Sequence, residues 1–239
     1  ATTLLPHAKS LLEEYDAIRS LRTLAAKSQS VVTIYALDHV LAYLGASLIE
    51  DFHEAYPSII LSVVDTTDAH AIAALASQQC SFAITAGPLD ETRFEGDPLF
   101  FSHYSVRMHR SHPLAKLPAL TYDDLDGQTI ISKGRAYDCF RHNIDRYFLA
   151  PGRKIHILAE TADESIIRTL LLHNKAINIG YDYADLLYPH PDIVSRTLKE
   201  EISGQMIYLV SNPQVRKTKA ACLFRDYLLE WMKKKAAIG

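Results

Sequence analysis

The chain has 239 residues, which is enough for one large domain or two small ones. Hydrophobic residues make up 48% and charged residues 22%, as in ordinary globular proteins, and the formal net charge of −3 argues against a surface built as a whole to bind nucleic acid. No apolar run approaches the roughly 20 residues of a membrane span, and no signal peptide opens the chain. We therefore expect a cytoplasmic protein without a membrane partner.

The first predicted element is an amphipathic helix over residues 4–27. Its apolar residues recur at threes and fours from Leu4 to Leu21 and form a stripe that nothing within the segment can bury. We expect this helix to pack on another helix, most simply on its own copy in a second chain. A polar linker, Lys27–Ser30, follows it.

The segment Val31–Asp65 is the most informative part of the sequence. Val31–Tyr35 and Ser58–Asp65 are β-branched and apolar, and Asp38 stands where it would cap a helix of about residues 39–54. A parallel β-α-β unit of this kind places the first N–H groups of the helix at the carboxyl edge of the sheet. Because open α/β sheets bind small molecules at that edge, the segment predicts where a ligand cleft lies.

Strands and helices alternate along the rest of the chain. We predict further strands at residues 82–86, 104–109, 129–132, 155–159, 176–180 and 206–210, and helices at residues 69–79, 137–148, 164–173 and 215–235. Asp163 is expected to cap the helix that begins at Glu164. Two sets of similar size predict two lobes, with the last strand and helix returning to the first lobe. That is the geometry of a hinged protein that closes on a ligand.

Several short motifs, taken together and in order, resemble one family. Residues 4–16 (LLPHAKSLLEEYD) are similar to the linker helix of LysR-type transcriptional regulators. Phe52–Pro57 resembles that family's "F...YP" step, Ser111–Ala115 its "HPLA" segment, and Asn178–Gly180 its late "G-x-G-I" strand. The resemblance covers essentially the whole chain.

The resemblance implies an α/β fold of two Rossmann-like lobes joined by a hinge, like a type 2 periplasmic binding protein. A linker and dimerisation helix would occupy residues 1–28, lobe I residues 29–107 and 208–239, and lobe II residues 108–207. The family's winged helix-turn-helix is expected to be missing, because the sequence begins inside the linker helix and no segment resembles a reading helix. The implied protein is the effector-sensing domain of a regulator. It would contact DNA only through that absent domain and would form a homodimer or homotetramer.

The family's effector lies between the lobes, so the resemblance implies one wall from each lobe. The implied walls are Ala36, Leu37, Asp38, His39, Thr66, Thr67 and Thr85 in lobe I, and Ser132, Lys133, Thr161 and Tyr181 in lobe II. No cofactor and no metal are implied. A metal held by His103 and His109 is disfavoured, because six positions along a straight strand separate them by roughly 20 Å.

Asp38 departs from the family pattern, in which a small hydroxyl residue often opens this helix. An aspartate would cap the helix N–H groups itself and add negative charge, which disfavours a simple carboxylate effector and favours an amine or a polyol. Lys133, Arg135 and His39 could reverse this preference by supplying countercharge. Asp38 as a helix cap alone remains an alternative, and so do Thr66 and Thr67 as caps.

Two other classes of protein are weaker alternatives. A solute-binding protein of a transporter shares the fold, but the lack of a signal peptide and the N-terminal helix argue against it. An enzyme is disfavoured because no G-x-S-x-G, HExxH or P-loop pattern occurs.

The predicted helices at 39–54 and 164–173 carry more apolar residues than one core face needs. Val40 and Tyr43 lie to one side of the first, and Leu172 lies off the face of the second. Members of the family pair these two helices side by side in an antiparallel dimer. We expect the same pairing here.

Overall fold

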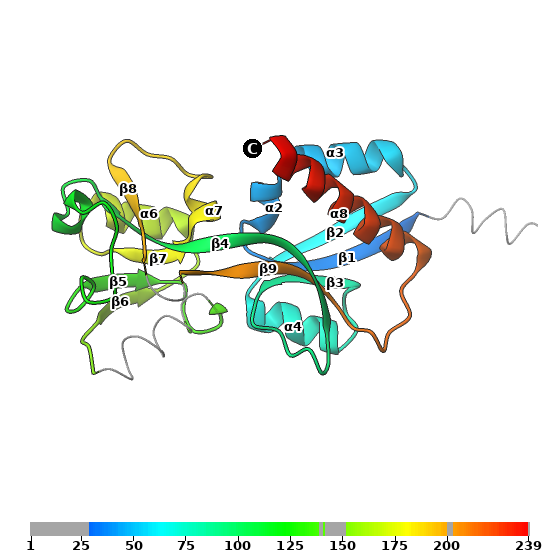
Figure 1. Ribbon diagram of the computed structural model, residues 1–239, viewed down its shortest axis with the longest axis horizontal. Helices are drawn as coiled ribbons and strands as arrows, with labels where there is room; N and C mark the ends of the chain where they lie inside the picture. Colours follow the sequence, from blue (N-terminus) through cyan, green and yellow to red (C-terminus); the bar gives the residue numbers. More distant parts are fainter. Residues whose placement is uncertain (1–28, 139–140, 142–151, 200–202, 239) are drawn as a thin grey trace, which may run out of the picture.

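The computed structural model describes residues 29–138, 141, 152–199 and 203–238. The predicted linker helix and most of the helix predicted at 137–148 lie outside these residues. Two lobes lie side by side and are connected by two long antiparallel strands, β4 (Glu95–His109) and β9 (Gly204–Ser211) (Figure 1). The predicted two-lobed α/β fold is therefore confirmed. The lobe boundaries predicted near residues 107 and 207 fall inside β4 and β9 and stay predictions.

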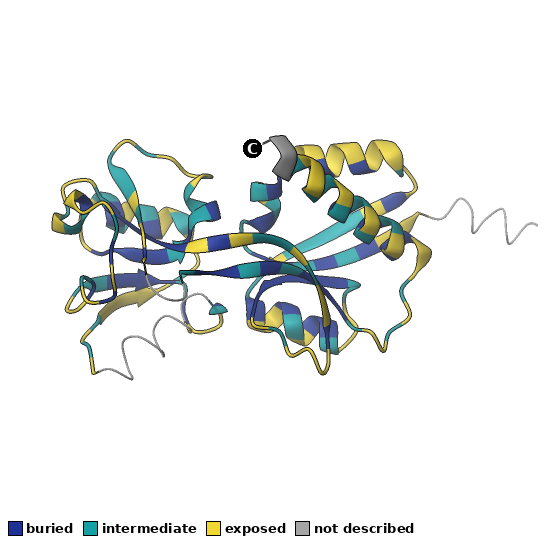
Figure 2. Ribbon diagram, in the orientation of Figure 1, coloured by how far each residue is buried: buried dark blue, intermediate teal, exposed yellow. Residues whose placement is uncertain are grey.

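Lobe I is built on a sheet with the strand order β2-β1-β3-β9-β4. Its first three strands are β1 (Ser30–Leu37), β2 (Ile59–Thr66) and β3 (Phe82–Ala86). β1 pairs in parallel with both β2 and β3, as the β-α-β pattern predicts, and β9 pairs antiparallel with β3. All five residues of β3 are buried, so it is the centre of the lobe (Figure 2).

Helices cover both faces of this sheet. α2 (Val40–Leu44), α3 (Ala46–Ala55) and α8 (Lys219–Ile238) lie on one face, and α4 (Asp68–Ala76) lies on the other (Figure 1). Phe52 of α3 and Phe224 of α8 pack edge to face, with ring centroids 5.4 Å apart, and both are almost fully buried. This aromatic contact fixes α8 on the lobe.

The prediction of a single helix over residues 39–54 is wrong in two respects. It is divided at Gly45, whose φ of 100° and ψ of 154° lie in a region that only glycine adopts freely. It also begins one residue later than a cap by Asp38 requires. The N-cap is His39, in the left-handed conformation with φ 66°, and no side chain caps the helix there. The carboxylate of Asp38 is therefore available for other contacts.

Lobe II is built on the second half of β4. Tyr104–Arg107 pairs with β7 (Asn178–Tyr181), and Ser105–His109 pairs with β8 (Ile193–Thr197). Two further strands of lobe II, β5 and β6, pair in parallel with each other. An isolated bridge between Ile130 of β5 and Ile177, the residue before β7, connects this pair to the rest of the lobe. The bounds of the remaining elements of lobe II are Thr129–Ser132 for β5, His156–Glu160 for β6, Glu164–Leu172 for α6, Asp182–Asp185 for α7 and Pro113–Lys116 for the 3-10 helix η1.

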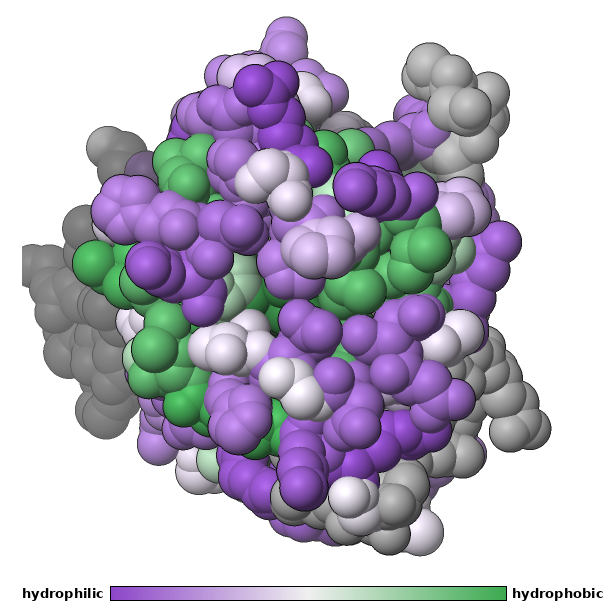
Figure 3. Space-filling model, turned by 90° about the vertical axis from the view of Figure 1, so that its left-hand side faces the viewer, coloured by the Kyte–Doolittle hydropathy of each residue, from purple (hydrophilic) through white to green (hydrophobic). Residues whose placement is uncertain are grey.

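Asp163 caps α6 as predicted, since its carboxylate accepts hydrogen bonds from the backbone amides of Ser165 and Ile166. Seen end on, lobe II shows hydrophobic residues among hydrophilic ones (Figure 3). Its exposed large hydrophobic residues include Ile157 and Leu158 on β6 and Ile166 on α6. The side chain of Ile166 is therefore an exposed hydrophobic group on the surface of α6.

Candidate functional site

The two lobes meet at the carboxyl edges of their strands. Lys133, directly after β5, donates a charged hydrogen bond to the carboxylate of Asp38, directly after β1. Tyr183 of α7 donates its hydroxyl to the backbone carbonyl of Asp38 at 3.0 Å. The backbone amide of Ala69 donates to the carbonyl of Ala136 at 3.4 Å. These contacts hold the lobes in a closed arrangement.

A cavity of about 30 Å³ lies behind these contacts. Its lining comes from both lobes and consists of Leu37, Asp38, Asp68, Arg107, Lys133, Tyr137, Asn178, Ile179, Gly180, Tyr181, Tyr183, Ala184 and Asp185. That volume has room for only one or two water molecules. A metabolite therefore enters only if the lobes separate or the side chains that fill the cleft move.

Asp68 is the buried carboxylate of lobe I in this cavity. It is the first residue of α4, and only 1% of it is exposed. It accepts hydrogen bonds from the hydroxyl of Thr85 at 2.7 Å, the amide of Ala86 at 3.0 Å and the amide of Asp138 at 3.0 Å. Burial raises the pKa of Asp68, and these hydrogen bonds oppose that rise. The Asp68 carboxylate thus accepts hydrogen bonds from donors of both lobes.

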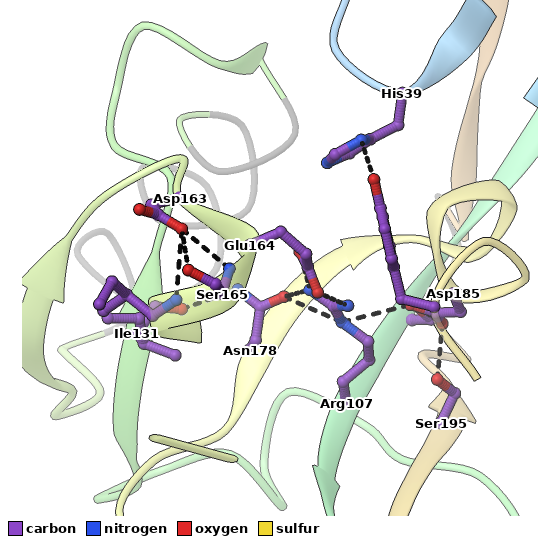
Figure 4. A network of polar contacts seen from close by, with 12 residues as sticks. His39, Arg107, Ile131, Asp163, Glu164, Ser165, Asn178, Asp185 and Ser195 are labelled. Atoms are coloured by element: carbon purple, nitrogen blue, oxygen red, sulfur yellow. Dashed lines mark hydrogen bonds and ion pairs between the residues drawn. The ribbon is translucent and has the colours of Figure 1, made fainter. Parts of the chain in front are cut away.

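Arg107 is the buried cation of lobe II (Figure 4). Its guanidinium forms a two-point contact with Glu164, at 2.6 and 3.1 Å, and donates to the side-chain oxygen of Asn178 at 2.8 Å. Asp185 lies 3.4 Å from its Nε. Burial acts to lower the pKa of Arg107, but Glu164 and Asp185 outweigh it, so the pKa is raised. Two carboxylates therefore neutralise this cation.

His39 lies at the outer side of the Asp38–Lys133 pair. Its Nε2 is 3.4 Å from the Asp38 carboxylate, and its ring meets Tyr188 of lobe II edge to face, with centroids 5.3 Å apart. Burial and the nearby Lys133 ammonium lower the pKa of His39. Lys133, which donates directly to the Asp38 carboxylate, supplies the countercharge of Asp38.

The structure brings some of the predicted wall residues together. Leu37, Asp38, Lys133 and Tyr181 line the cavity, and Thr85 reaches it through Asp68. His39 lines an open groove beside it.

Five other predicted wall residues do not line the cavity. Ala36 is buried in the hydrophobic core, and the Ser132 hydroxyl accepts from the amide of Gly134 at 3.1 Å. Thr67 caps α4, while the neighbouring Thr66 bonds the His70 ring. The Thr161 hydroxyl accepts from the amide of Asp163 at 3.1 Å. These hydroxyls serve local turns and helix starts.

The sequence does not predict the charged and polar cavity residues that lie within helices and strands rather than directly after a strand. Asp68 follows Thr67 at a helix start, and Arg107 is a charged residue in an otherwise buried strand segment. Buried charges are rare unless paired, so Arg107 in a buried strand was the available signal. Asn178, Tyr183 and Asp185 gave no comparable local signal.

The described part of the chain carries no metal-binding cluster and no membrane-spanning helix. No three His, Cys, Asp or Glu side chains there gather closely enough to hold a metal ion. Cys80 is half-buried, and burial raises its pKa to about 11, while Cys222 is exposed. No helix among the described residues is long and apolar enough to cross a bilayer.

The fold and the cleft define a class of protein, namely a two-lobed binding domain of the type 2 periplasmic-binding-protein kind. The family described as "LysR substrate binding domain" matches residues 25–233. The chain belongs to the LysR substrate-binding domain family, as the sequence motifs indicate.

Curated relatives are similar to this chain over part of their length. The HTH-type transcriptional regulator CysB of Burkholderia cenocepacia is 24% identical over 183 residues, which cover 76% of this chain and 58% of the relative. The uncharacterized HTH-type transcriptional regulator YbhD of Escherichia coli is 23% identical over 129 residues, 54% of this chain and 41% of that protein. The chain thus spans about half the length of these relatives.

Solved structures of low sequence identity share the fold. The effector binding domain of QuiR in complex with shikimate superposes with a TM-score of 0.74 at 20% identity, covering 87% of this chain and 99% of that one. The CcmR regulatory domain of Synechocystis PCC6803 in complex with 2-PG gives 0.77 at 16% identity, covering 86% and 98%. A full-length OxyR variant from Pseudomonas aeruginosa gives 0.77 at 18% identity, covering 96% and 83%.

Proposed function

We propose that this chain is the effector-sensing domain of a LysR-type transcriptional regulator. It binds a small metabolite between its lobes, releases it unchanged, and passes the altered lobe arrangement to a DNA-binding domain of the full-length protein. The observation that carries this proposal is the cavity closed by Lys133 and Asp38 from opposite lobes. Family membership favours a regulator over the solute-binding protein of a transporter, since both curated relatives named above are HTH-type regulators.

The mechanism is differential binding to two lobe arrangements. A ligand shifts an equilibrium only as far as its affinities for the two states differ, and about 1–3 kcal/mol is a typical coupling between sites. Here the chain's own contacts close the cleft, so an effector must replace the Asp38–Lys133 contact with contacts of its own. The lobe angle then depends on the effector bound.

A steric block at Gly180 tests the binding site. Gly180 lines the cavity, and a Cβ added to it would meet only Asn178, at 3.8 Å. Gly180→Ala should therefore retain binding, while Gly180→Leu should project into the cavity and abolish it. The measurement is the shift of thermal unfolding of the chain on a broad metabolite panel, because a ligand at 100 times its Kd stabilises by about 2.7 kcal/mol.

The regulatory step is tested on the full-length gene product. A metabolite that stabilises the wild-type chain should change the footprint or affinity of the full-length protein on the DNA upstream of neighbouring genes. If no compound of the panel shifts the unfolding, or if Gly180→Leu binds as well as Gly180→Ala, the proposal is wrong.

A further inference from the structure

We propose, on the basis of the function proposed above, that the effector is a zwitterion, a molecule that carries both an ammonium and a carboxylate group. Its ammonium would pair with Asp38 and its carboxylate with Lys133, so that it inserts between the two lobes. The inference follows from which charges and hydrogen-bond donors of the cleft the chain has already paired.

The neutral donors of lobe I are taken by a carboxylate of the chain. Asp68 accepts from the hydroxyl of Thr85 and from the amide of Ala86, and a third donor comes from Asp138 of lobe II. The donors of Thr85 and Ala86 lie at the carboxyl end of β3, where an effector carboxylate would otherwise bind. Because Asp68 is almost fully buried among them, an incoming carboxylate finds them occupied.

The guanidinium of Arg107 is likewise already paired with carboxylates of the chain. Glu164 contacts its guanidinium at two points, and Asp185 approaches its Nε. An anionic effector at Arg107 would lie against two carboxylates that already neutralise it. Removing one of them from a buried ion pair is costly, so Arg107 is a poor anchor for a further anion.

Among the residues that the structure describes, the remaining charges that line the cavity are those of Asp38 and Lys133. Both side chains are mostly buried, with 16% and 17% exposed, and they come from opposite lobes. A monoanion would bind Lys133 and leave the Asp38 carboxylate with only the His39 ring, whose Nε2 lies 3.4 Å away. A monocation would bind Asp38 and leave the Lys133 ammonium without its carboxylate. A zwitterion replaces one ion pair with two, so neither side chain is left unpaired, and electrostatic complementarity of this kind gives specificity.

The rest of the lining fits the body of such a molecule. The apolar and aromatic residues that line the cavity are Leu37, Tyr137, Ile179, Tyr181, Tyr183 and Ala184. Tyr181 and Tyr183 are stacked, with ring centroids 5.7 Å apart. When the lobes part, these side chains offer an apolar surface beside the charged pair, so an amino acid with a hydrophobic side chain meets both parts of the site.

The test uses matched ligands on the wild-type chain. Calorimetric titration is carried out with the common L-amino acids whose side chains are uncharged and, for each of them, with the deaminated acid and the decarboxylated amine. We expect at least one amino acid to bind, and we expect each of its two singly charged relatives to bind about 100-fold more weakly or not at all.

Two variants then separate the charges. In Asp38→Asn the preference for the amino acid over its deaminated acid should fall by about 10-fold or more, and in Lys133→Met the preference over its amine should fall similarly. Each ratio compares two ligands on one variant, so a general loss of stability does not imitate the result. Arg110→Gln is the control, because Arg110 is 65% exposed and pairs with Asp192 outside the cavity, and both ratios should stay unchanged.

The outcomes distinguish this inference from the function on which it rests. If a singly charged or uncharged metabolite binds as tightly as any amino acid, the zwitterion is excluded and the sensing function stands. If neither these ligands nor the broader panel binds, both fail. Unchanged ratios in Asp38→Asn and Lys133→Met also exclude the assigned pairing.

Discussion

The backbone amide of Asp138 in lobe II donates a hydrogen bond to the carboxylate of Asp68 in lobe I, at 3.0 Å. The charge of Asp68 acts across the cleft on the carboxyl group of Asp138. Burial is the larger cause and the charge of Asp68 the next in raising the pKa of Asp138 to about 6. The closed arrangement thus favours a proton on Asp138 at mildly acidic pH.

This raised pKa predicts a pH dependence of stability. A carboxyl that titrates near 3.9 in the unfolded chain and near 6 in the folded one holds its proton more tightly when folded. Its stabilising effect is complete below about pH 4 and is lost as the pH rises through 6. After a discount for solvent screening, the wild-type chain should therefore lose about 1–2 kcal/mol relative to Asp138→Asn between pH 4 and 7.

Urea unfolding of both proteins at several pH values measures this difference. Asp226→Asn serves as the control for the loss of an exposed carboxylate, because Asp226 is 73% exposed. A free-energy difference between wild type and Asp138→Asn that is flat from pH 4 to 7 would contradict the raised pKa.

Arg107 is predicted to be a large contributor to the stability of lobe II. Its removal leaves Glu164 and Asp185 without a cation, and losing one partner of a buried ion pair costs about 3–5 kcal/mol. Arg107→Gln should lower the free energy of unfolding by an amount near that range in urea denaturation. Arg110→Gln removes an exposed pair with Asp192 and should cost less than about 1 kcal/mol. Equal effects of the two substitutions would show that burial of Arg107 does not matter.

Thr67 and Thr66 test whether a hydroxyl at this helix start serves the ligand or the helix. The Thr67 hydroxyl accepts from the amide of His70 at 3.1 Å and caps α4, so Thr67→Ala should lower the free energy of unfolding by about 1 kcal/mol. Thr66→Ala, which removes no cap, should cost less. Neither residue lines the cavity, so the affinity for an effector should be the same in both variants. A selective loss of affinity in Thr67→Ala would assign it to the binding site instead.

Local patterns predicted the strands that are apolar and β-branched, and they failed where the pattern is interrupted. Phe82–Ala86 and Thr129–Ser132 are the strands β3 and β5 to the residue. The first half of β4 was missed because Gly96, Asp97 and Pro98 interrupt it, and its place in the sheet comes from pairing with β9. The break at Gly45 was missed because one glycine in an apolar pattern is compatible with a continuous helix.

The site was harder to predict for a different reason. The side chains that fill the cleft contact one another across long stretches of sequence, as Arg107 does with Glu164 and Asn178. The family resemblance predicts Asp38 and Lys133 in the walls of the cleft, and the topology agrees because both residues follow strands. Whether their side chains pair depends on how the lobes close, and that information lies in no single segment.

The antiparallel pairing of α3 with α6 of a second chain remains a prediction. The structure changes which residues are expected at that interface. Val40, expected on the surface, is fully buried, and Tyr43 packs against Phe100, with ring centroids 4.7 Å apart. The exposed large hydrophobic residues on these two helices are instead Ile49, at 39%, and Ile166, at 49%. Exposed hydrophobic residues on two such faces favour an interface between copies.

Sedimentation velocity at micromolar concentration measures this pairing. The wild-type chain should sediment as a dimer or a larger assembly, and Ile166→Lys should shift it toward monomer, because a charge buried at an apolar interface is unfavourable. Leu186→Lys is the matched control, since Leu186 is 71% exposed and lies outside both helices, and it should leave the assembly intact. A monomeric wild-type chain, or an Ile166→Lys variant that still pairs, would exclude α6 from the interface.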